Sequence, residues 1–167
     1  YAATSAFRII TDGGKHYLYC NEYYGGTWGV QFSTNVGTYA LPQFIRTGMV
    51  LSNTSSAASF TVADWDTDGM LDILLYMNGT NMFYRNTGNN DAPAYAAPVP
   101  VAADGAPMVF GDFRAQSCVV DWDSDGDNDL LMQRNAQFIG YYENTNGQAP
   151  VLLYRGALTA DTTQISW

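Results

Sequence analysis

Short apolar segments alternate with turn residues along the whole chain, and no stretch repeats its apolar residues with the 3.6-residue period of a helix. The segments contain aliphatic and aromatic residues and are bounded by Gly, Asn, Asp or Pro, which is typical of strands. The pattern therefore predicts an all-β fold. The clearest segments are residues 60–63, 73–76, 82–86, 118–120, 130–132 and 138–144.

The spacing of Asp-Gly pairs indicates an internal repeat of about 57 residues. The pairs at residues 68–69 and 125–126 are 57 residues apart. A weaker copy at residues 11–13 begins 56 residues before Thr67. Self-similarity at a fixed period of this length is typical of repeat architectures.

Each copy is followed by the same order of predicted elements. Two strands come first, and then a polar turn that ends in Pro42, Pro93 or Pro150. A last strand follows the proline, for example at residues 43–46 and 151–155. Four short strands per repeat are typical of a β-propeller blade. We therefore predict about three four-stranded antiparallel blades, which form an incomplete arc of a larger propeller or assembly.

The composition excludes several classes of protein. Hydrophobic residues make up 47% of the 167 residues, which is too many for a disordered chain. The net charge is −9, and the few basic residues are scattered, so we expect no nucleic-acid partner. No apolar run approaches the roughly 18 residues that span a bilayer, so membrane insertion is not expected. The chain starts at Tyr1 without a signal-peptide pattern, and we expect a mature or excised piece.

The acidic residues are concentrated in two nine-residue loops. Nine of the sixteen carboxylates lie at residues 64–72 and 121–129, which we call the first and second acidic loops. Such crowding is unfavourable unless a cation neutralises it. A solvated acidic turn is the simpler alternative, because Asp and Gly are ordinary turn residues. The shared register argues against that alternative, since both loops place Asp at positions 1, 3, 5 and 9 and Gly at position 6.

These oxygen ligands favour Ca²⁺, which accepts six to eight of them. Mg²⁺ prefers a smaller octahedron with retained waters, and Zn²⁺ prefers Cys or His. We predict two Ca²⁺ sites in which carboxylates at positions 1, 3, 5 and 9 and a backbone carbonyl at position 7 bind the ion. The predicted ligands are Asp64, Asp66, Asp68, Met70 and Asp72 in the first acidic loop and Asp121, Asp123, Asp125, Asp127 and Asp129 in the second.

The loops begin like an EF-hand but do not end like one. An EF-hand has a bidentate Glu at position 12 and a helix on each side. Position 12 is Leu75 in the first acidic loop and Met132 in the second. The flanking segments are apolar and strand-like, so each loop is predicted to join two strands.

With these features, the chain resembles the FG-GAP or VCBS repeats, the calcium-loop blades of integrin α-chain propellers, some fungal lectins and many secreted adhesion proteins. The matching segments are VADWDTDGMLDILL, FYRNTG and AP in one repeat, and VVDWDSDGDNDLLM and YYENTNGQAP in the next. The resemblance covers about 100 residues. It implies that each loop links the first two strands of a blade and binds Ca²⁺. The first repeat departs from the pattern, since it has only Asp12 together with Lys15, and we expect no ion there.

The repeats set the predicted boundaries along the chain. Residues 1–57 are expected to form a degenerate blade, and residues 58–114 and 115–162 two calcium-loop blades. Residues 163–167 are expected to form the first strand of a further blade. Because an isolated arc would expose strand edges and apolar faces, we expect the chain not to be a self-sufficient monomer.

Tryptophan and cysteine positions give further expectations. Trp65 and Trp122 occupy position 2 of the acidic loops, and Trp167 follows a related segment. We expect all three to pack between blades rather than to stack on a sugar. Cys20 and Cys118 lie a whole blade apart, so we expect two separate, mostly buried thiols instead of a disulfide.

No catalytic residue is predicted, and we expect the chain not to be an enzyme. His16 is the only histidine and has no neighbouring Ser or Cys nucleophile in the sequence. Asn53 and Asn78 begin Asn-x-Ser/Thr sequons in predicted turns, which would suit glycosylation of a secreted protein.

The preferred hypothesis is an extracellular or cell-surface calcium-binding module for adhesion, scaffolding or ligand binding, in which Ca²⁺ is structural. Its expected partners are other blades of the same or a neighbouring chain and an extracellular protein or glycan. A glycan-binding lectin propeller and an accessory domain of a secreted polysaccharide-active enzyme are the alternatives. These functions rest on fold analogy.

Overall fold

The computed structural model describes residues 3–24, 27–35, 49–51, 59–77, 79–109, 116–134, 138–147, 150–160 and 163–164. Every regular element in these ranges is a strand, so the predicted all-β class is confirmed. None of these residues belongs to a helix, and therefore none forms a helix long and apolar enough to cross a bilayer.

Most strands form three sheets whose members follow one another along the chain. The first sheet has the order β1-β2-β3-β4, and the central sheet has the order β5-β6-β7-β8. All neighbours in these two sheets are antiparallel. The strands are β1 (Ala3–Asp12), β2 (Lys15–Tyr24), β3 (Thr27–Asn35), β4 (Met49–Leu51), β5 (Ser59–Ala63), β6 (Asp72–Met77), β7 (Thr80–Tyr84) and β8 (Val99–Pro100).

The third sheet has the order β10-β9-β14-β13-β12-β11. Its strands are β9 (Ala102–Ala103), β10 (Ala106–Pro107), β11 (Ser117–Val120), β12 (Asp129–Arg134), β13 (Phe138–Asn144) and β14 (Leu152–Ala157). The short strands β15 (Thr159–Ala160) and β16 (Thr163–Gln164) pair with each other. The predicted strands around both acidic loops are thus confirmed, whereas the predicted strand at residues 43–46 lies outside the described residues.

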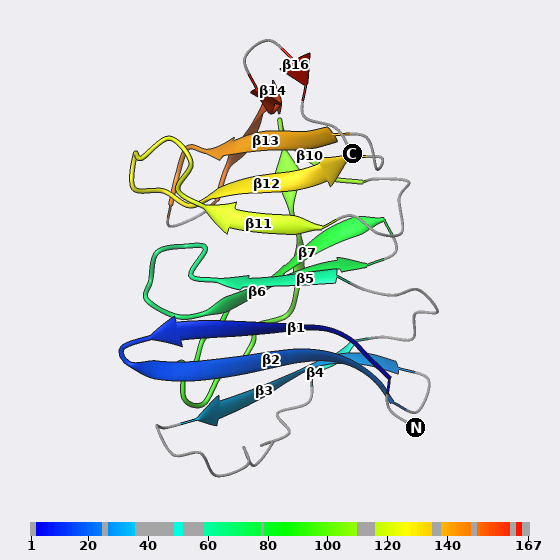
Figure 1. Cartoon of the computed structure of the whole chain (residues 1–167), viewed down its shortest axis with the longest axis vertical. Helices are drawn as coiled ribbons and strands as arrows, with labels where there is room; N and C mark the ends of the chain where they lie inside the picture. Colours follow the sequence, from blue (N-terminus) through cyan, green and yellow to red (C-terminus); the bar gives the residue numbers. More distant parts are fainter. Residues whose placement is uncertain are drawn as a thin grey trace.

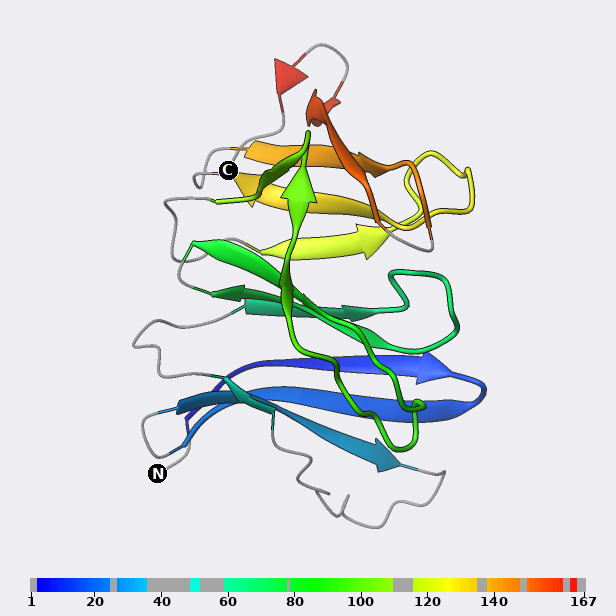
Figure 2. The same ribbon diagram turned by 180° about the vertical axis from the view of Figure 1, so that it is seen from behind.

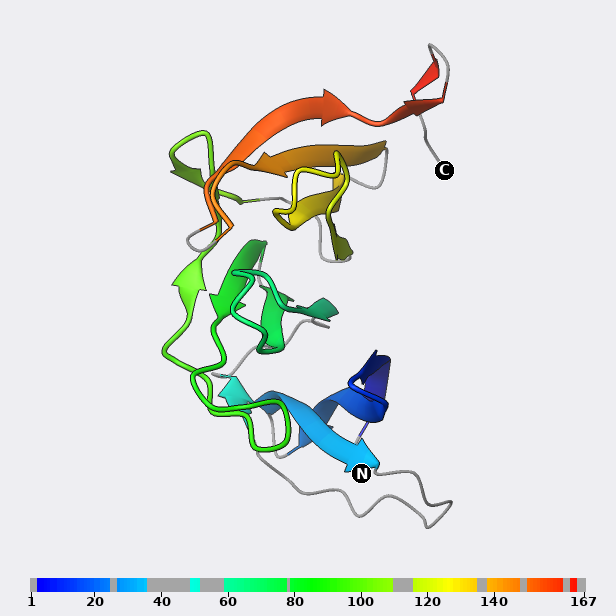
Figure 3. The same ribbon diagram turned by 90° about the vertical axis from the view of Figure 1, so that its left-hand side faces the viewer.

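The three sheets lie one above another along the longest axis of the molecule, with the central sheet in the middle (Figure 1). Strands β1, β5 and β11 each lie at an edge of their sheet, and β5 contacts both of the others. The chain that follows β7 runs along the side of the stack that is opposite to β1, β5 and β11, as Figures 2 and 3 show. The described residues form no closed ring or barrel, so the blade interpretation stays a prediction.

The central sheet is buried on both faces, which explains the continuous apolar run in β6. Ile73 and Leu75 belong to the core shared with Tyr17 of the first sheet. Leu74 and Tyr76 point the other way, into the core shared with the third sheet. Successive side chains of a strand alternate between faces, and a strand covered on both sides is therefore apolar at every position.

The short strands β9 and β10 belong to a different sheet from the one that the sequence repeat indicates. Residues 102–107 fall within the second predicted repeat, yet they extend the third sheet. Ala103 pairs in parallel with Leu152 of β14, and the Asp104 amide donates to the Leu152 carbonyl over 3.0 Å. A segment of two-residue strands has too little periodicity to reveal its partner in the sequence.

Candidate metal centre

The first acidic loop connects β5 to β6 and is folded around the carboxylate at its first position. Asp64 accepts hydrogen bonds from the amides of Asp68 and Gly69, at 3.0 and 2.9 Å. Asp68 in turn accepts one from the amide of Met70 at 2.9 Å. Gly69 has a φ of 87°, a conformation that L side chains rarely adopt, so glycine is favoured at position 6.

The second acidic loop, between β11 and β12, repeats these contacts. Asp121 accepts hydrogen bonds from the amides of Asp125 and Gly126, at 3.1 and 3.2 Å. Asp125 accepts one from the amide of Asp127 at 2.9 Å, and Gly126 has a φ of 98°. The shared register in the sequence therefore corresponds to a shared backbone conformation.

The carboxylates at position 9 tie each loop to the strand beside it. Asp72 is fully buried and accepts hydrogen bonds from the amides of Asn86, at 2.7 Å, and Trp65, at 3.1 Å. Asp129 is also fully buried and accepts from the amides of Asn144, at 2.7 Å, and Trp122, at 3.0 Å. These hydrogen bonds fix the positions of both carboxylates without an ion.

Two asparagines that the sequence analysis did not assign close the turns behind these loops. The Asn86 side-chain oxygen accepts hydrogen bonds from the amides of Gly88 and Ala94, at 3.0 and 3.1 Å. The Asn144 oxygen accepts in the same way from two amides in the following turn, including that of Val151 at 3.1 Å. The Asn-Thr pair after each second strand was the sequence signal for this role.

Three carboxylates converge in each loop. Oxygen atoms of Asp64, Asp66 and Asp72 all lie within 4.8 Å of one another, and the same holds for the corresponding residues of the second loop. These groups could hold a metal ion, and they contain the residues at positions 1, 3 and 9. The three residues of the second group are Asp121, Asp123 and Asp129. Ligation by the position 5 carboxylates and by the carbonyls of Met70 and Asp127 stays a prediction.

One buried carboxylate oxygen of the first group has no hydrogen-bond partner. Asp66 is 2% exposed, and its Oδ1 atom is buried without a hydrogen-bond partner. Burial raises the pKa of Asp66, and the charge of Asp68 raises it further. Burial likewise raises the pKa of Asp72 to about 7. The charged forms of these carboxyl groups are therefore disfavoured by their surroundings, and a bound cation would relieve that penalty.

The two groups differ in the side chain that reaches them from the neighbouring strand. Arg85 forms ion pairs from Nε to Asp66 Oδ2, at 2.6 Å, and from Nη2 to Asp68 Oδ2, at 3.0 Å. In the second group, the Tyr141 hydroxyl lies 3.2 Å from Asp123 Oδ2 and can donate to it. Sequence reasoning did not identify Arg85 or Tyr141, because neither lies in an acidic loop.

The turn between β1 and β2 holds the weak third copy of the motif. Asp12 accepts a hydrogen bond from the Asn90 side chain at 3.4 Å, and Lys15 forms an ion pair with Asp91. Asn90 also accepts a hydrogen bond from the amide of Leu71 at 2.7 Å. The turn at residues 90–91 thus bridges the first sheet and the first acidic loop, which the sequence did not indicate.

The tryptophans at position 2 have different surroundings. Trp65 is 1% exposed, donates from Nε1 to the Asn128 carbonyl over 3.2 Å and packs edge-on against Phe83. Its expected burial between units is confirmed. Trp122 is 50% exposed and contacts Tyr141 of its own sheet, so for Trp122 packing between blades stays a prediction. The third sheet packs over Trp65, whereas no sheet among the described residues packs over Trp122. Trp167 is outside the described residues.

The remaining sequence predictions have mixed outcomes. Cys118 is a free thiol, but it is exposed rather than buried, because it lines an open hollow on the third sheet. The side chains of Cys20 and His16 and the predicted sequons at Asn53 and Asn78 lie outside the described residues.

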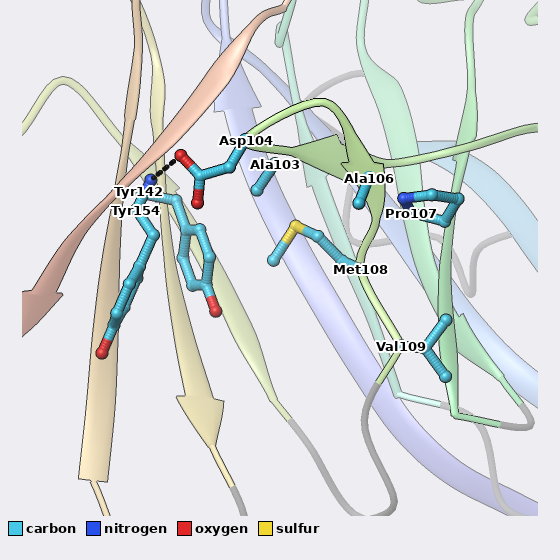
Figure 4. Close-up of a pocket in the computed structure, with 8 residues that line it drawn as sticks. All are labelled: Ala103, Asp104, Ala106, Pro107, Met108, Val109, Tyr142 and Tyr154. Carbon is cyan, nitrogen blue, oxygen red and sulfur yellow. Dashed lines mark hydrogen bonds between the residues drawn. The ribbon is translucent and has the colours of Figure 1, made fainter.

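A pocket of about 220 Å³ lies on the third sheet (Figure 4). Tyr142 and Tyr154 form one wall, with their ring centroids 5.0 Å apart, and Met108 faces them. Asp104 accepts a hydrogen bond from the Tyr154 amide at 3.3 Å and so is committed to the backbone. The other lining residues are Ala103, Ala106, Pro107 and Val109.

Comparison with known proteins adds no relative to this description. Neither the protein-family models, nor the curated proteins, nor the solved structures contain a match to the chain. Over the described residues, fold and site define an all-β chain with two acidic groups that could hold metal ions.

Proposed function

We propose that the chain is a segment of calcium-binding β-propeller blades of the FG-GAP or VCBS type and that it serves as an extracellular or cell-surface module for adhesion, scaffolding or ligand binding. Ca²⁺ would have a structural role. The observation that carries the proposal is the convergence of three carboxylates in each of two loops with the same backbone hydrogen bonds. The antiparallel order of β5 to β8 and of β11 to β14 is compatible with four-stranded blades.

The residues of the first group fit a divalent cation. A buried carboxylate oxygen without a partner, Oδ1 of Asp66, is an atom that an ion would satisfy. The ligands are oxygens only, which suits a hard cation, and a flexible loop with several carboxylates favours Ca²⁺ over Mg²⁺. When bound, the ion would neutralise the mutual repulsion of the Asp side chains and hold each loop rigidly against its strands.

Calcium binding is tested by its stoichiometry. Calorimetric titration of the chelator-treated protein is expected to give two Ca²⁺ ions per chain, and Mg²⁺ is expected to compete weakly. The Asp12→Ala variant is the control, since Asp12 lies in the turn that lacks the full motif, and it should still bind two ions. If the wild-type protein bound no Ca²⁺ at millimolar concentration, the proposal would be wrong.

The outer face of the third sheet is the proposed contact with a further blade. The central sheet uses Thr61, Leu74 and Trp65 on the face that packs against the third sheet. The corresponding residues of the third sheet are Cys118, Leu131 and Trp122, and they lie on its opposite face. Cys118 and Leu131 line a hollow of about 300 Å³ there. No described residue outside the third sheet is known to cover this face, and its layout matches that of the covered face of the central sheet, which favours a partner of the same kind.

This partner proposal predicts self-association or instability of the 167-residue chain alone. Multi-angle light scattering in Ca²⁺ buffer is expected to show dimers or larger species, because exposed strand edges and apolar faces promote association. The Leu131→Glu substitution places a charge on the proposed contact face and should shift the population toward monomer. A compact calcium-bound monomer of about 18 kDa over the whole concentration range would contradict the proposal.

The two alternatives remain a lectin propeller and an accessory domain of a secreted polysaccharide-active enzyme. A lectin needs aromatic and polar groups that are free to meet a sugar. In the pocket of Figure 4, Tyr142 is buried and Asp104 already accepts a backbone hydrogen bond, so the pocket does not favour glycan binding. We therefore retain the structural calcium module as the proposed function.

A further inference from the structure

The two acidic groups share a backbone but differ in the charge next to them. Asn86 and Asn144 are equivalent, since the amide of each donates to the position 9 carboxylate of its loop. The residue before Asn86 is Arg85, and the residue before Asn144 is Glu143. The same place in the two units therefore carries opposite charges.

These two side chains make different contacts. The Arg85 guanidinium bridges Asp66 and Asp68, the carboxylates at positions 3 and 5 of the first acidic loop. Glu143 forms an ion pair with Arg155 of β14 instead. In the second loop, the neutral Tyr141 hydroxyl lies 3.2 Å from Asp123 Oδ2.

Arg85 leaves part of the first group open. It contacts only Oδ2 of Asp66, while Oδ1 of the same carboxylate is buried without a partner. An ion can thus bind Oδ1 while the guanidinium remains on Oδ2. The arginine does not have to leave Asp66, but its positive charge stays beside the ion.

We propose that Arg85 is a built-in competing cation, which makes the first acidic loop the weaker Ca²⁺ site and the second acidic loop the one filled first. This inference rests on the proposed calcium binding. In the absence of Ca²⁺, Arg85 partly neutralises the first loop; in its presence, Arg85 opposes binding. The second loop has no such cation among the described residues, and it also carries five carboxylates against four.

The size of the effect follows from the exposure of the arginine. Its side chain is 50% exposed, so its charge acts in a water-like environment. A unit charge roughly 5 Å from a divalent ion in water then changes the binding constant by about tenfold. Removal of the Arg85 charge should therefore raise the Ca²⁺ affinity of the first loop by about tenfold. The affinity of the second loop should not change.

The test measures each loop separately by calorimetric Ca²⁺ titration of the full chain. Asp123→Asn weakens the second loop and isolates the first, and Asp64→Asn does the reverse. In the Asp123→Asn background, Arg85→Gln is expected to lower the Kd by about tenfold. In the Asp64→Asn background, it should change the Kd by less than about twofold, because Arg85 does not contact the second loop.

Two further variants separate charge from structure. Arg155→Gln removes the same charge from an arginine paired with Glu143 rather than with a loop, and it should leave the first loop unchanged. Arg85→Lys keeps the positive charge but lacks the planar guanidinium group. The Ca²⁺ affinity of the first loop should therefore stay low in this variant. Thermal melting in chelator provides a second measurement, in which Arg85→Gln should be less stable than wild type.

The outcomes distinguish this inference from the proposed function. If Ca²⁺ binds but Arg85→Gln does not tighten the first loop, or if Arg85→Lys tightens it equally, the inference is wrong. If Ca²⁺ binds in neither background, with or without the Arg85→Gln substitution, calcium binding itself fails. A first loop that binds only in Arg85→Gln would support the inference in its strongest form.

Discussion

Replacement of Trp65 by alanine is expected to lower the free energy of unfolding by about 3–5 kcal/mol, the usual loss for a large aromatic side chain in a core. Trp65 is almost completely buried, and it joins the central and third sheets through its hydrogen bond to the Asn128 carbonyl. The loss combines a cavity with one lost hydrogen bond to the Asn128 carbonyl, which keeps the Asn144 side-chain amide as a donor. Chemical denaturation with Ca²⁺ held constant measures it.

Trp122 provides a matched control for this variant. It occupies the same position of the second acidic loop but is half exposed. Trp122→Ala should cost less than about 1 kcal/mol in the monomer, as is usual for surface substitutions. Equal losses for the two variants would contradict the difference in burial described above.

Removal of Ca²⁺ is expected to lower the free energy of unfolding by about 5 kcal/mol. A ligand that binds only the native state stabilises it by about 2.7 kcal/mol at a hundredfold excess over Kd, and two independent sites add. Denaturation in saturating Ca²⁺ and in EGTA measures the difference. Asp125→Ala and Asp68→Ala should each remove the contribution of one loop, whereas Asp12→Ala should leave it unchanged.

The same experiment has a clear negative outcome. A denaturation midpoint that stays the same after exhaustive chelation would mean that the loops are stable without an ion. In that case, hydrogen bonds such as those from the Asp68 and Gly69 amides to Asp64 would suffice to hold them.

Local pattern was sufficient to predict most strands and both acidic loops. The run at residues 73–76 is apolar at every position because the strand is covered on both faces, and such a run is visible in sequence. The positions of Asp and Gly in the loops are equally local, since the hydrogen bonds described within each loop connect residues at most seven apart. These features need no knowledge of the tertiary structure.

The remaining features depend on which segments become neighbours. Arg85 and Tyr141 reach the acidic groups from adjacent strands, so their roles follow from strand pairing and not from the loops. Trp65 and Trp122 have nearly identical local sequences, yet only one is covered by another sheet. Asn90 contacts the first acidic loop from 19 residues away along the chain. Spacing within a motif carries no information about such contacts.

The path of the chain between β8 and β9 has a consequence for dividing the protein into fragments. β8 ends the central sheet at Pro100, and after the buried Val101 the chain enters the third sheet as β9. The edge of the third sheet is therefore supplied by residues that precede the sequence repeat to which its other strands belong. A cut at the repeat boundary near residue 115 would remove that edge, so a recombined or transplanted unit that preserves the third sheet has to start near residue 101.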